Sequence, residues 1–350
     1  MPVIFDEAGY DVTICDPTYA GYKENPDLSI FDDYPDIHKY ITMGKVGMGQ
    51  GNELMESEMK KGHALEYNLV VYSFMKILPF IAQRYIYDYG GYCSLKPTGN
   101  QNCSNVCQST GLVDSFIESY NVLRNLDEIT NIAENGNTFM FMCNNTTHEP
   151  SLLKTPDYVP ADVINNQSYI NEHKDKYTID NRTMKMEQTE QARHYHANMA
   201  AAIQMGNYFD YLRENNVYDN TRIIIVADHG YPTNQFDDLK LGSGVTEDVV
   251  GFNPILMVKD FNSSEFTVDK EFMTNGDVPT LAAKDIIENP INPFTHKAIN
   301  SIEKTSHEQH IIHSEYHNIG NNGETQFHKA PWYSVHDNIF DLNNWKVVNE

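Results

Sequence analysis

Short apolar runs alternate with longer amphipathic segments along most of this chain. Residues 221–227 are rich in β-branched and apolar side chains, which is typical of a strand buried on both faces of a parallel sheet. Three further runs predict strands, at residues 10–15, 138–143 and 253–259. Four segments predict helices, at residues 53–87, 114–131, 189–215 and 277–287. The alternation predicts an α/β fold with a mostly parallel central sheet and helices on both of its faces.

The longest apolar region, residues 69–86, is interrupted by Lys76, Pro79 and Arg84. A membrane-spanning helix needs about 20 consecutive apolar residues, so we expect a buried helix here and not a span. The opening sequence MPVIFDEAGY is too short and too charged for a signal peptide. The sequence therefore predicts no signal or transmembrane segment in this chain.

The net charge limits the partners that the chain can bind, and the length limits the number of domains that it can form. The 350 residues carry a formal net charge of −24, which excludes binding to nucleic acid through neutralised phosphates. The same surplus of carboxylates offers oxygen ligands for metal cations. The length suits one large α/β domain or two smaller ones. We expect an α/β domain over residues 1–300, followed by a tail or small subdomain over residues 301–350.

Three of the five cysteines lie close together in a loop rich in Gly, Asn and Ser. They are Cys93, Cys103 and Cys107, and the paired CxxC hooks of a zinc ribbon are missing from the loop. One disulfide within the loop is compatible with a location outside the cytoplasm, but the third cysteine would then be left over. The cysteines therefore leave the pairing open.

Asp228, His229 and Gly230 follow the strand predicted at residues 221–227. Ligands of open α/β sheets bind at the carboxyl ends of the strands. A carboxylate oxygen beside an imidazole nitrogen suits a divalent metal at such a place, and Gly230 lets the backbone turn away without crowding the ion. A strand followed by an ordinary polar turn explains the pair equally well.

Histidines supply the other candidate site residues. His148 follows the strand predicted at residues 138–143, and neighbouring parallel strands would bring it close to Asp228. Its simpler explanation is a loop histidine with local hydrogen bonds. His194 and His196 lie two positions apart on a predicted helix, so they point to different faces and cannot both bind one ion; surface histidines are the simpler explanation for each. The tail holds six more that could supply a ligand, namely His307, His310, His313, His317, His328 and His336.

Several motifs occur in a specific order between residues 137 and 297. They read NTFMFMCNNTTHEP, MGNYFDYLRENNVYDNTRIIIVADHG, GFNPILMVKDF, NGDVPTLAAKDII and NPFTHK. In this series the chain resembles the membrane-anchored bacterial branch of the alkaline phosphatase/sulfatase superfamily, which includes lipoteichoic acid synthases and phosphoethanolamine transferases. The opening MPVIFDEAGYDVTICDPTYAGY is similar to the segment that follows the nucleophile in such proteins. The resemblance implies an alkaline phosphatase-like α/β fold.

The resemblance also implies roles for individual residues. Asp228 and His229 match the metal-binding Asp-His pair of the family. His148 matches a loop histidine that contacts the phosphate or sulfate group in relatives, and His196 lies where transferases of this kind carry a substrate-side histidine. Both histidines are therefore expected to bind substrate and to take part in catalysis. The implied cofactor is a divalent metal, with Mn, Zn, Ca and Mg all open.

The family's nucleophile and its acidic companion ligand precede the segment with which this chain starts, and no nucleophile motif follows later. We expect a sulfatase-like metal-dependent hydrolase or phospho-group transferase that acts on sulfate or phosphate esters of cell-envelope glycans or lipids, inactive as this N-terminally incomplete piece. The alternative is a catalytically dead extracellular binding module for polyanionic glycans or lipid head groups. Either reading places the chain at the extracellular or periplasmic face, with membrane proximity in a longer, anchored parent protein.

Overall fold

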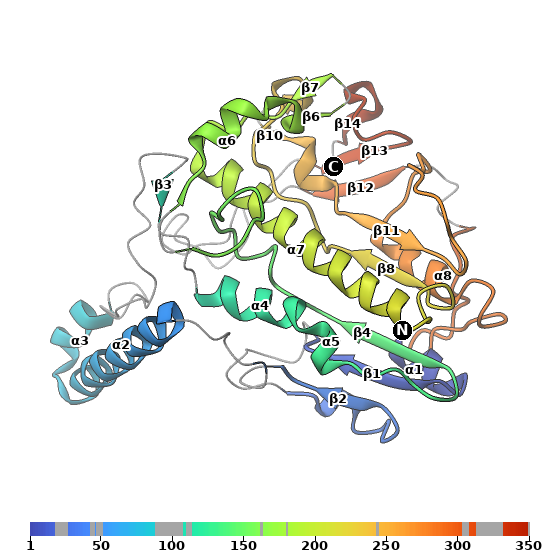
Figure 1. Ribbon diagram of the computed structural model, residues 1–350, viewed down its shortest axis with the longest axis horizontal. Coiled ribbons are helices and arrows are strands. Elements are labelled where there is room, and N and C mark those ends of the chain that lie inside the picture. The colour runs from blue at the N-terminus through green and yellow to red at the C-terminus, as the bar shows by residue number, and fades with distance from the viewer. Residues whose placement is uncertain are drawn as a thin grey trace.

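A computed structural model of the chain describes residues 1–17, 27–42, 46, 52–87, 108–109, 114–161, 164–179, 181–242, 245–302, 308–312 and 332–348. Helices and strands are mixed along the chain, in agreement with the predicted α/β class. The long helix α7 (Thr189–Glu214) runs through the middle of the main body in Figure 1. The loop with Cys93, Cys103 and Cys107 lies outside the described residues.

Three strands form a parallel sheet in the order β2-β1-β4. They are β1 (Asp11–Cys15), β2 (His38–Tyr40) and β4 (Thr138–Met142). Val12 and Ile14 alternate along β1 and are fully buried, as the two-residue period of a strand requires. They share one apolar core with helix α1 (Pro2–Glu7) and with Phe139 and Phe141 of β4. The strands predicted at residues 10–15 and 138–143 are thus confirmed.

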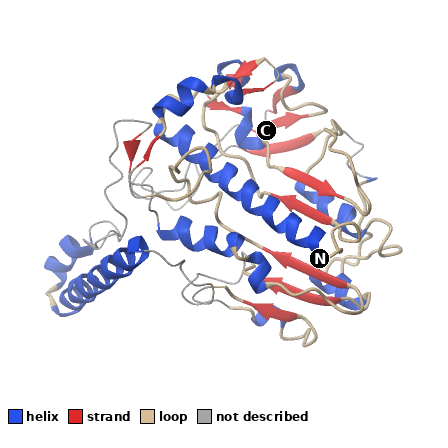
Figure 2. Ribbon diagram, in the orientation of Figure 1, coloured by secondary structure: helices blue, strands red, loops and turns tan. Residues whose placement is uncertain are grey.

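A second, two-stranded sheet holds β8, whose end carries the Asp-His pair. Strand β8 (Ile223–Val226) pairs antiparallel with β11 (Leu256–Lys259). In Figure 2 the arrowheads of β4 and β8 point the same way, and Ile224 packs against the core that contains Phe139. The described strands nevertheless form small separate sheets, and no large parallel central sheet is shown. Val226 is exposed and the other residues of β8 are half-buried, so the predicted burial of this strand on both faces is wrong. Among the described strands, β8 pairs with β11 alone.

Helix α7 packs against α4 (Asp114–Arg124) through small residues on one helix and large ones on the other. Ala197 and Ala200 of α7 are fully buried against Phe116 and Tyr120 of α4. Alanine lets the two backbones approach closely and favours the helical conformation. A short helix, α5 (Leu126–Ile129), follows α4. The helices predicted at residues 114–131 and 189–215 are confirmed.

Helix α8 (Val278–Ala283) is tied to β8 through a buried arginine. Its start has Pro279 within the first turn, which suits the first positions of a helix. The Arg222 guanidinium, at the start of β8, donates to the Asp260 carboxylate at 2.8 Å. It also donates to the carbonyl oxygens of Leu281, Ala282 and Lys284, at 3.1, 3.2 and 2.6 Å. The guanidinium therefore caps the C-terminal end of α8 and also forms an ion pair with the Asp260 carboxylate.

The C-terminal part of the chain forms an antiparallel sheet of β12 (Gln309–Ile312), β13 (Trp332–Val335) and β14 (Trp345–Val348). Tyr333 and Trp345 of this sheet share a core with Leu239 and Val249, which flank the hairpin of β9 (Lys240–Gly242) and β10 (Val245–Asp248). The domain boundary at residue 300 stays a prediction. Besides short 3-10 turns, the remaining described elements are β3 (Gln108–Ser109), β5 (Ile164–Asn165), α6 (Gln167–Glu172), β6 (Thr178–Ile179) and β7 (Arg182–Thr183).

The apolar region at residues 69–86 forms the end of α2 (Asn52–Ile77) and most of α3 (Phe80–Tyr87), with Pro79 between the two helices. The prediction of a buried helix is wrong here, because most of the large apolar side chains of this region are exposed. In Figure 1 the two helices lie outside the main body. Among the helices that the structure describes, none combines the length and the hydropathy that crossing a bilayer demands.

Candidate functional site

The backbone at the carboxyl end of β8 is fixed by two contacts. The Asn275 side-chain amide donates to the carbonyl oxygens of Ala227 and Asp228, at 2.9 and 2.8 Å. Gly230 lies so close to the next loop that a Cβ atom there would be 2.0 Å from the carbonyl oxygen of Val250. A side chain larger than hydrogen therefore cannot fit without displacing backbone. Glycine is thus required at this position by the neighbouring loop, and the expectation that it keeps the backbone clear of an ion stays a prediction.

The side chains of Asp228 and His229 lie at the surface, and the oxygen and nitrogen atoms that could bind a metal lie near each other. They are 88% and 66% exposed, and His229 Nε2 is 3.7 Å from Asp228 Oδ2. His229 Nδ1 is 2.7 Å from the carbonyl oxygen of Gly230, which can only accept, so Nδ1 carries the proton. In the neutral ring this leaves the lone pair on Nε2, the arrangement that metal-binding histidines use. One oxygen and one nitrogen thus fit a divalent cation as two of its ligands.

The loop after β4 is held against α4 by its asparagine. Asn144 Nδ2 donates to the carbonyl oxygen of Ser119 at 2.9 Å, while Asn144 Oδ1 accepts from the backbone N–H and the hydroxyl of Thr146, at 2.9 and 2.6 Å. His148 then projects into solvent, with Nδ1 at 3.5 Å from the Glu149 carboxylate. The loop is therefore ordered by short-range hydrogen bonds while its imidazole stays available to a ligand.

His194 of α7 connects this region to the end of β8. Its Nε2 is 3.1 Å from Glu190 Oε1, and its ring stacks on Tyr231 with 4.0 Å between ring centroids. Burial lowers the pKa of His194; the Glu190 carboxylate offsets part of this, and the charges of Arg193 and His148 lower the pKa further. Helix α7 therefore contacts the loop after β8 through the His194–Tyr231 pair, two residues beyond His229.

His196 is not brought to that place. It is fully buried, and its Nδ1 accepts a hydrogen bond from the backbone N–H of Leu153 at 3.1 Å. Its other ring nitrogen makes no hydrogen bond to any described residue, and burial lowers its pKa to about 4. Because His194 and His196 lie two positions apart, one faces Tyr231 and the other faces the core, as the helical period requires. The catalytic role expected for His196 stays a prediction, and its observed surroundings are those of a core residue.

His194 is the site residue that sequence reasoning left unassigned. The spacing separated the two histidines onto different faces but gave no sign of which face is buried. Two signals point to His194 in retrospect: Glu190 precedes it by one helical turn, and Tyr231 directly follows the Asp-His-Gly series. Each signal is a pattern over a few residues, and it identifies His194 only when the position of α7 relative to the loop after β8 is known.

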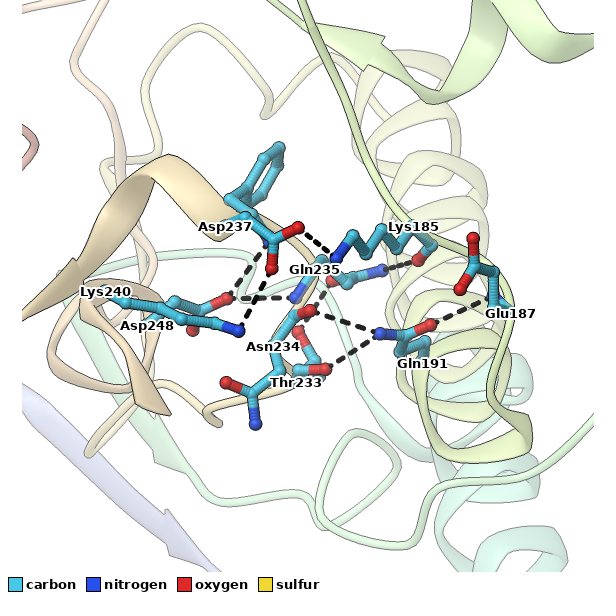
Figure 3. Close-up of polar contacts among 10 residues, drawn as sticks. Lys185, Glu187, Gln191, Thr233, Asn234, Gln235, Asp237, Lys240 and Asp248 are labelled. Atoms are coloured by element: carbon cyan, nitrogen blue, oxygen red, sulfur yellow. Dashed lines mark hydrogen bonds and ion pairs between the residues drawn. The ribbon is translucent and has the colours of Figure 1, made fainter. Parts of the chain in front are cut away.

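A network of side chains ties the loop after Tyr231 to the start of α7 (Figure 3). The Gln191 side-chain amide donates to the carbonyl oxygen of Thr233 at 3.1 Å, and its oxygen caps the first turn of α7 by accepting from the backbone N–H of Gln188 at 3.1 Å. The fully buried Asp248 accepts from the backbone N–H of Gln235 at 3.0 Å, and burial raises the pKa of this carboxyl. The network fixes the loop that carries Tyr231 relative to His194.

Further metal ligands are not gathered in the described part of the chain. Within it, no group of three or more His, Cys, Asp or Glu side chains is placed to hold a metal ion, so Asp228 and His229 stand as a pair. Of the histidines in the tail, His310 is exposed on β12 and His336 pairs with Asp337 at 2.8 Å. The others, His307, His313, His317 and His328, lie outside the described residues.

Comparison with known proteins adds no assignment. No family model, no curated protein and no solved structure matches this chain. The resemblance to the alkaline phosphatase/sulfatase superfamily is therefore carried by the motifs of the chain alone.

Proposed function

We propose that the carboxyl ends of β4 and β8 form the ester-binding site of a sulfatase-like metal-dependent hydrolase or phospho-group transferase. The supporting observation is the stacking of His194, on α7, against Tyr231 in the loop that follows Asp228 and His229. The charge of His148, in the loop after β4, also acts on the pKa of His194. Sites of open α/β sheets are built in this way from several loops at one edge. The substrate class is a phosphate or sulfate ester of a cell-envelope glycan or lipid.

Each group has a role that its surroundings allow. A divalent cation held by Asp228 and His229 would offset the negative charge of a bound phosphoryl or sulfuryl group. His148 is exposed and can donate to an oxygen of that group. His194 stacks on Tyr231, and burial lowers the pKa of its ring, so its role would be to orient Tyr231 and the loop beside the ester. The sequence assigns no nucleophile, so we expect this chain by itself to bind such esters without turning them over.

Metal binding tests the proposal directly. The chain is freed of metal with a chelator, and binding of Mn²⁺, Zn²⁺, Ca²⁺ and Mg²⁺ is followed by calorimetry and by the shift in melting temperature. Asp228→Asn and His229→Gln should each weaken binding at least roughly tenfold, as loss of supporting groups does in other metal sites. Asp337→Asn is the matched control, since Asp337 is also an exposed carboxylate beside a histidine. Equal effects of the Asp228 and Asp337 substitutions would refute the assignment.

Binding of anions tests the second part of the proposal, which is that the site binds the phosphate or sulfate group of an ester. Inorganic phosphate, inorganic sulfate and p-nitrophenyl phosphate are titrated with and without the tightest-binding cation. We expect binding that depends on the cation and that His148→Ala weakens. Binding that ignores both the cation and His148 would contradict the site.

A catalytically dead module for polyanionic glycans or lipid head groups is the second candidate. It is favoured by the pairwise nature of the Asp228–His229 site, since the described residues contribute no third donor and catalytic metal sites commonly have three protein ligands. It predicts anion binding without metal and no hydrolysis of phosphodiester or sulfate ester substrates under any condition tested.

A further inference from the structure

The helical hairpin of α2 and α3, over residues 65–87, exposes a series of large apolar side chains. Phe80 is 86% exposed and Ile81 is 77% exposed, next to the bend at Pro79. Figure 1 shows the hairpin extending from the main body. Large apolar side chains that lie exposed in one segment indicate an interaction site in a folded protein. Further exposed apolar or aromatic residues of the hairpin are Leu65, Tyr67, Leu69, Val70, Tyr72, Phe74, Ile77, Tyr85 and Tyr87.

These side chains surround α2 and do not form one stripe. At roughly 100° per residue, Leu65 and Tyr72 lie on one side of the helix, while Phe74 lies on the opposite side. Pairing with a second copy or with another helix buries one stripe of about 100° or a little more. Such a partner would leave the opposite apolar side in water. Around the bend at Pro79, the apolar edge of a bilayer can cover several sides of the helix ends at once, which a single partner helix cannot.

The charges of the hairpin are placed for lipid phosphates. Lys76 and Arg84 are exposed and lie on either side of the bend, whereas Glu66 is the one acidic residue between positions 65 and 87. The whole chain carries −24, so this apolar tip with its two cations contrasts with the acidic character of the remainder. Lysine and arginine next to apolar residues keep their heads at the phosphate layer while their stems lie in the bilayer. Four tyrosines in the same segment suit that layer too.

We propose that the α2–α3 hairpin inserts its bend, around Phe80 and Ile81, into the interfacial layer of a lipid bilayer that contains anionic head groups. Neither helix meets the requirements for a span, and a shallow interfacial position needs no span. The hairpin would hold this chain at a membrane surface by its own residues. This inference is independent of the ester-binding site, and it adds to that proposal a direct means of reaching esters of envelope lipids.

Flotation with lipid vesicles tests the proposal. The purified chain is mixed with vesicles of phosphatidylcholine, or of phosphatidylcholine with phosphatidylglycerol, and the bound fraction is measured. We expect binding that phosphatidylglycerol strengthens. The double variant Phe80→Asp/Ile81→Asp should lower the partition coefficient roughly tenfold or more, because two large apolar side chains no longer leave water. The variant Lys76→Gln/Arg84→Gln should lose only the part that depends on phosphatidylglycerol.

A matched control separates the hairpin from exposed apolar residues in general. Phe266 and Val268 are 88% and 73% exposed in a loop of the main body, so Phe266→Asp/Val268→Asp should bind vesicles as the wild type does. As an independent readout, the fluorescence of Phe80→Trp should be quenched by brominated lipid. Circular dichroism checks that each variant is folded.

Three results would overturn the proposal. The first is an absence of vesicle binding by the wild type, and the second is an equal loss in the control variant. The third is self-association in sedimentation velocity that Phe80→Asp/Ile81→Asp abolishes while vesicle binding stays undetected, which would assign the hairpin to a contact between two copies of the chain.

Discussion

Protonation of His196 should destabilise the fold in mild acid, and the size of the effect follows from its burial. The ring is fully buried and its pKa is lowered to about 4, while an unfolded histidine titrates near 6.5. The folded state therefore binds fewer protons than the unfolded state between these values. Stability from the neutral ring is present above about pH 6.5 and is lost as the pH falls toward 4. At pH 5 the linkage relation gives a loss of about 2 kcal/mol relative to pH 7.5.

The assay compares urea denaturation of the wild type and of His196→Asn across this pH range. Asparagine keeps an acceptor for the N–H of Leu153 but does not titrate, so its unfolding free energy should fall by about 2 kcal/mol less between pH 7.5 and pH 5. At neutral pH the smaller side chain should cost about 1–3 kcal/mol through the cavity it leaves. His310→Asn, at an exposed position on β12, should change neither quantity.

Parallel pH profiles for the wild type and His196→Asn would refute this reasoning. They would mean that the ring takes up a proton without unfolding, as a histidine open to solvent and substrate does. The same result would favour the catalytic role expected for His196 from the resemblance, so the experiment distinguishes a core residue from a site residue.

Three further substitutions test single contacts. Gly230→Ala places a methyl carbon 2.0 Å from a backbone carbonyl oxygen and should cost roughly 2–4 kcal/mol of unfolding free energy. Gly206→Ala, inside α7 with nothing within 4 Å, should instead gain about 0.5–1 kcal/mol in the same urea titration. Asp248→Asn removes a carboxyl whose pKa is raised by burial. As the pH rises above about 4, the melting temperature of the wild type should therefore fall relative to that of the variant. Arg222→Met removes a donor from a half-exposed carboxylate and from three carbonyl oxygens and should cost about 1–3 kcal/mol in denaturant.

Each of these predictions has an outcome that contradicts it. Equal losses at the two glycines would mean that the contact with the next loop does not restrict Gly230. A difference between Asp248→Asn and the wild type that is independent of pH would show that this carboxyl is not destabilised by its burial. A near-neutral Arg222→Met would mean that the ties to α8 and to the aspartate add little to the fold.

The sequence by itself located most of the regular elements near the functional site. Apolar runs gave β1, β4 and β8 to within a residue or two, and the spacing of apolar residues gave α4 and α7. These elements follow from local patterns, because burial on a strand or a helix repeats with a fixed period. The proximity of Asp228 and His229 also follows from the sequence, since adjacent residues at a strand end with a glycine after them have few ways to separate.

Only the tertiary structure decided which surfaces are covered. The apolar composition of residues 69–86 predicted a buried helix. The segment is helical, but most of its large apolar side chains are exposed. Composition alone does not say which other segment packs against a helix. The pairing of β8 with β11 in an antiparallel sheet depends equally on contacts between distant segments.

Contacts between distant segments also explain why His194, and not the predicted His196, contacts the loop after β8. The helical period placed them on different faces, but the core that covers His196 is built from Leu153 and Tyr158, some forty residues earlier in the chain. The stacking that orients His194 comes from Tyr231, beyond the end of α7. Long-range packing therefore decided which histidine contacts the loop after β8, since the burial of each imidazole depends on neighbours that are remote in sequence.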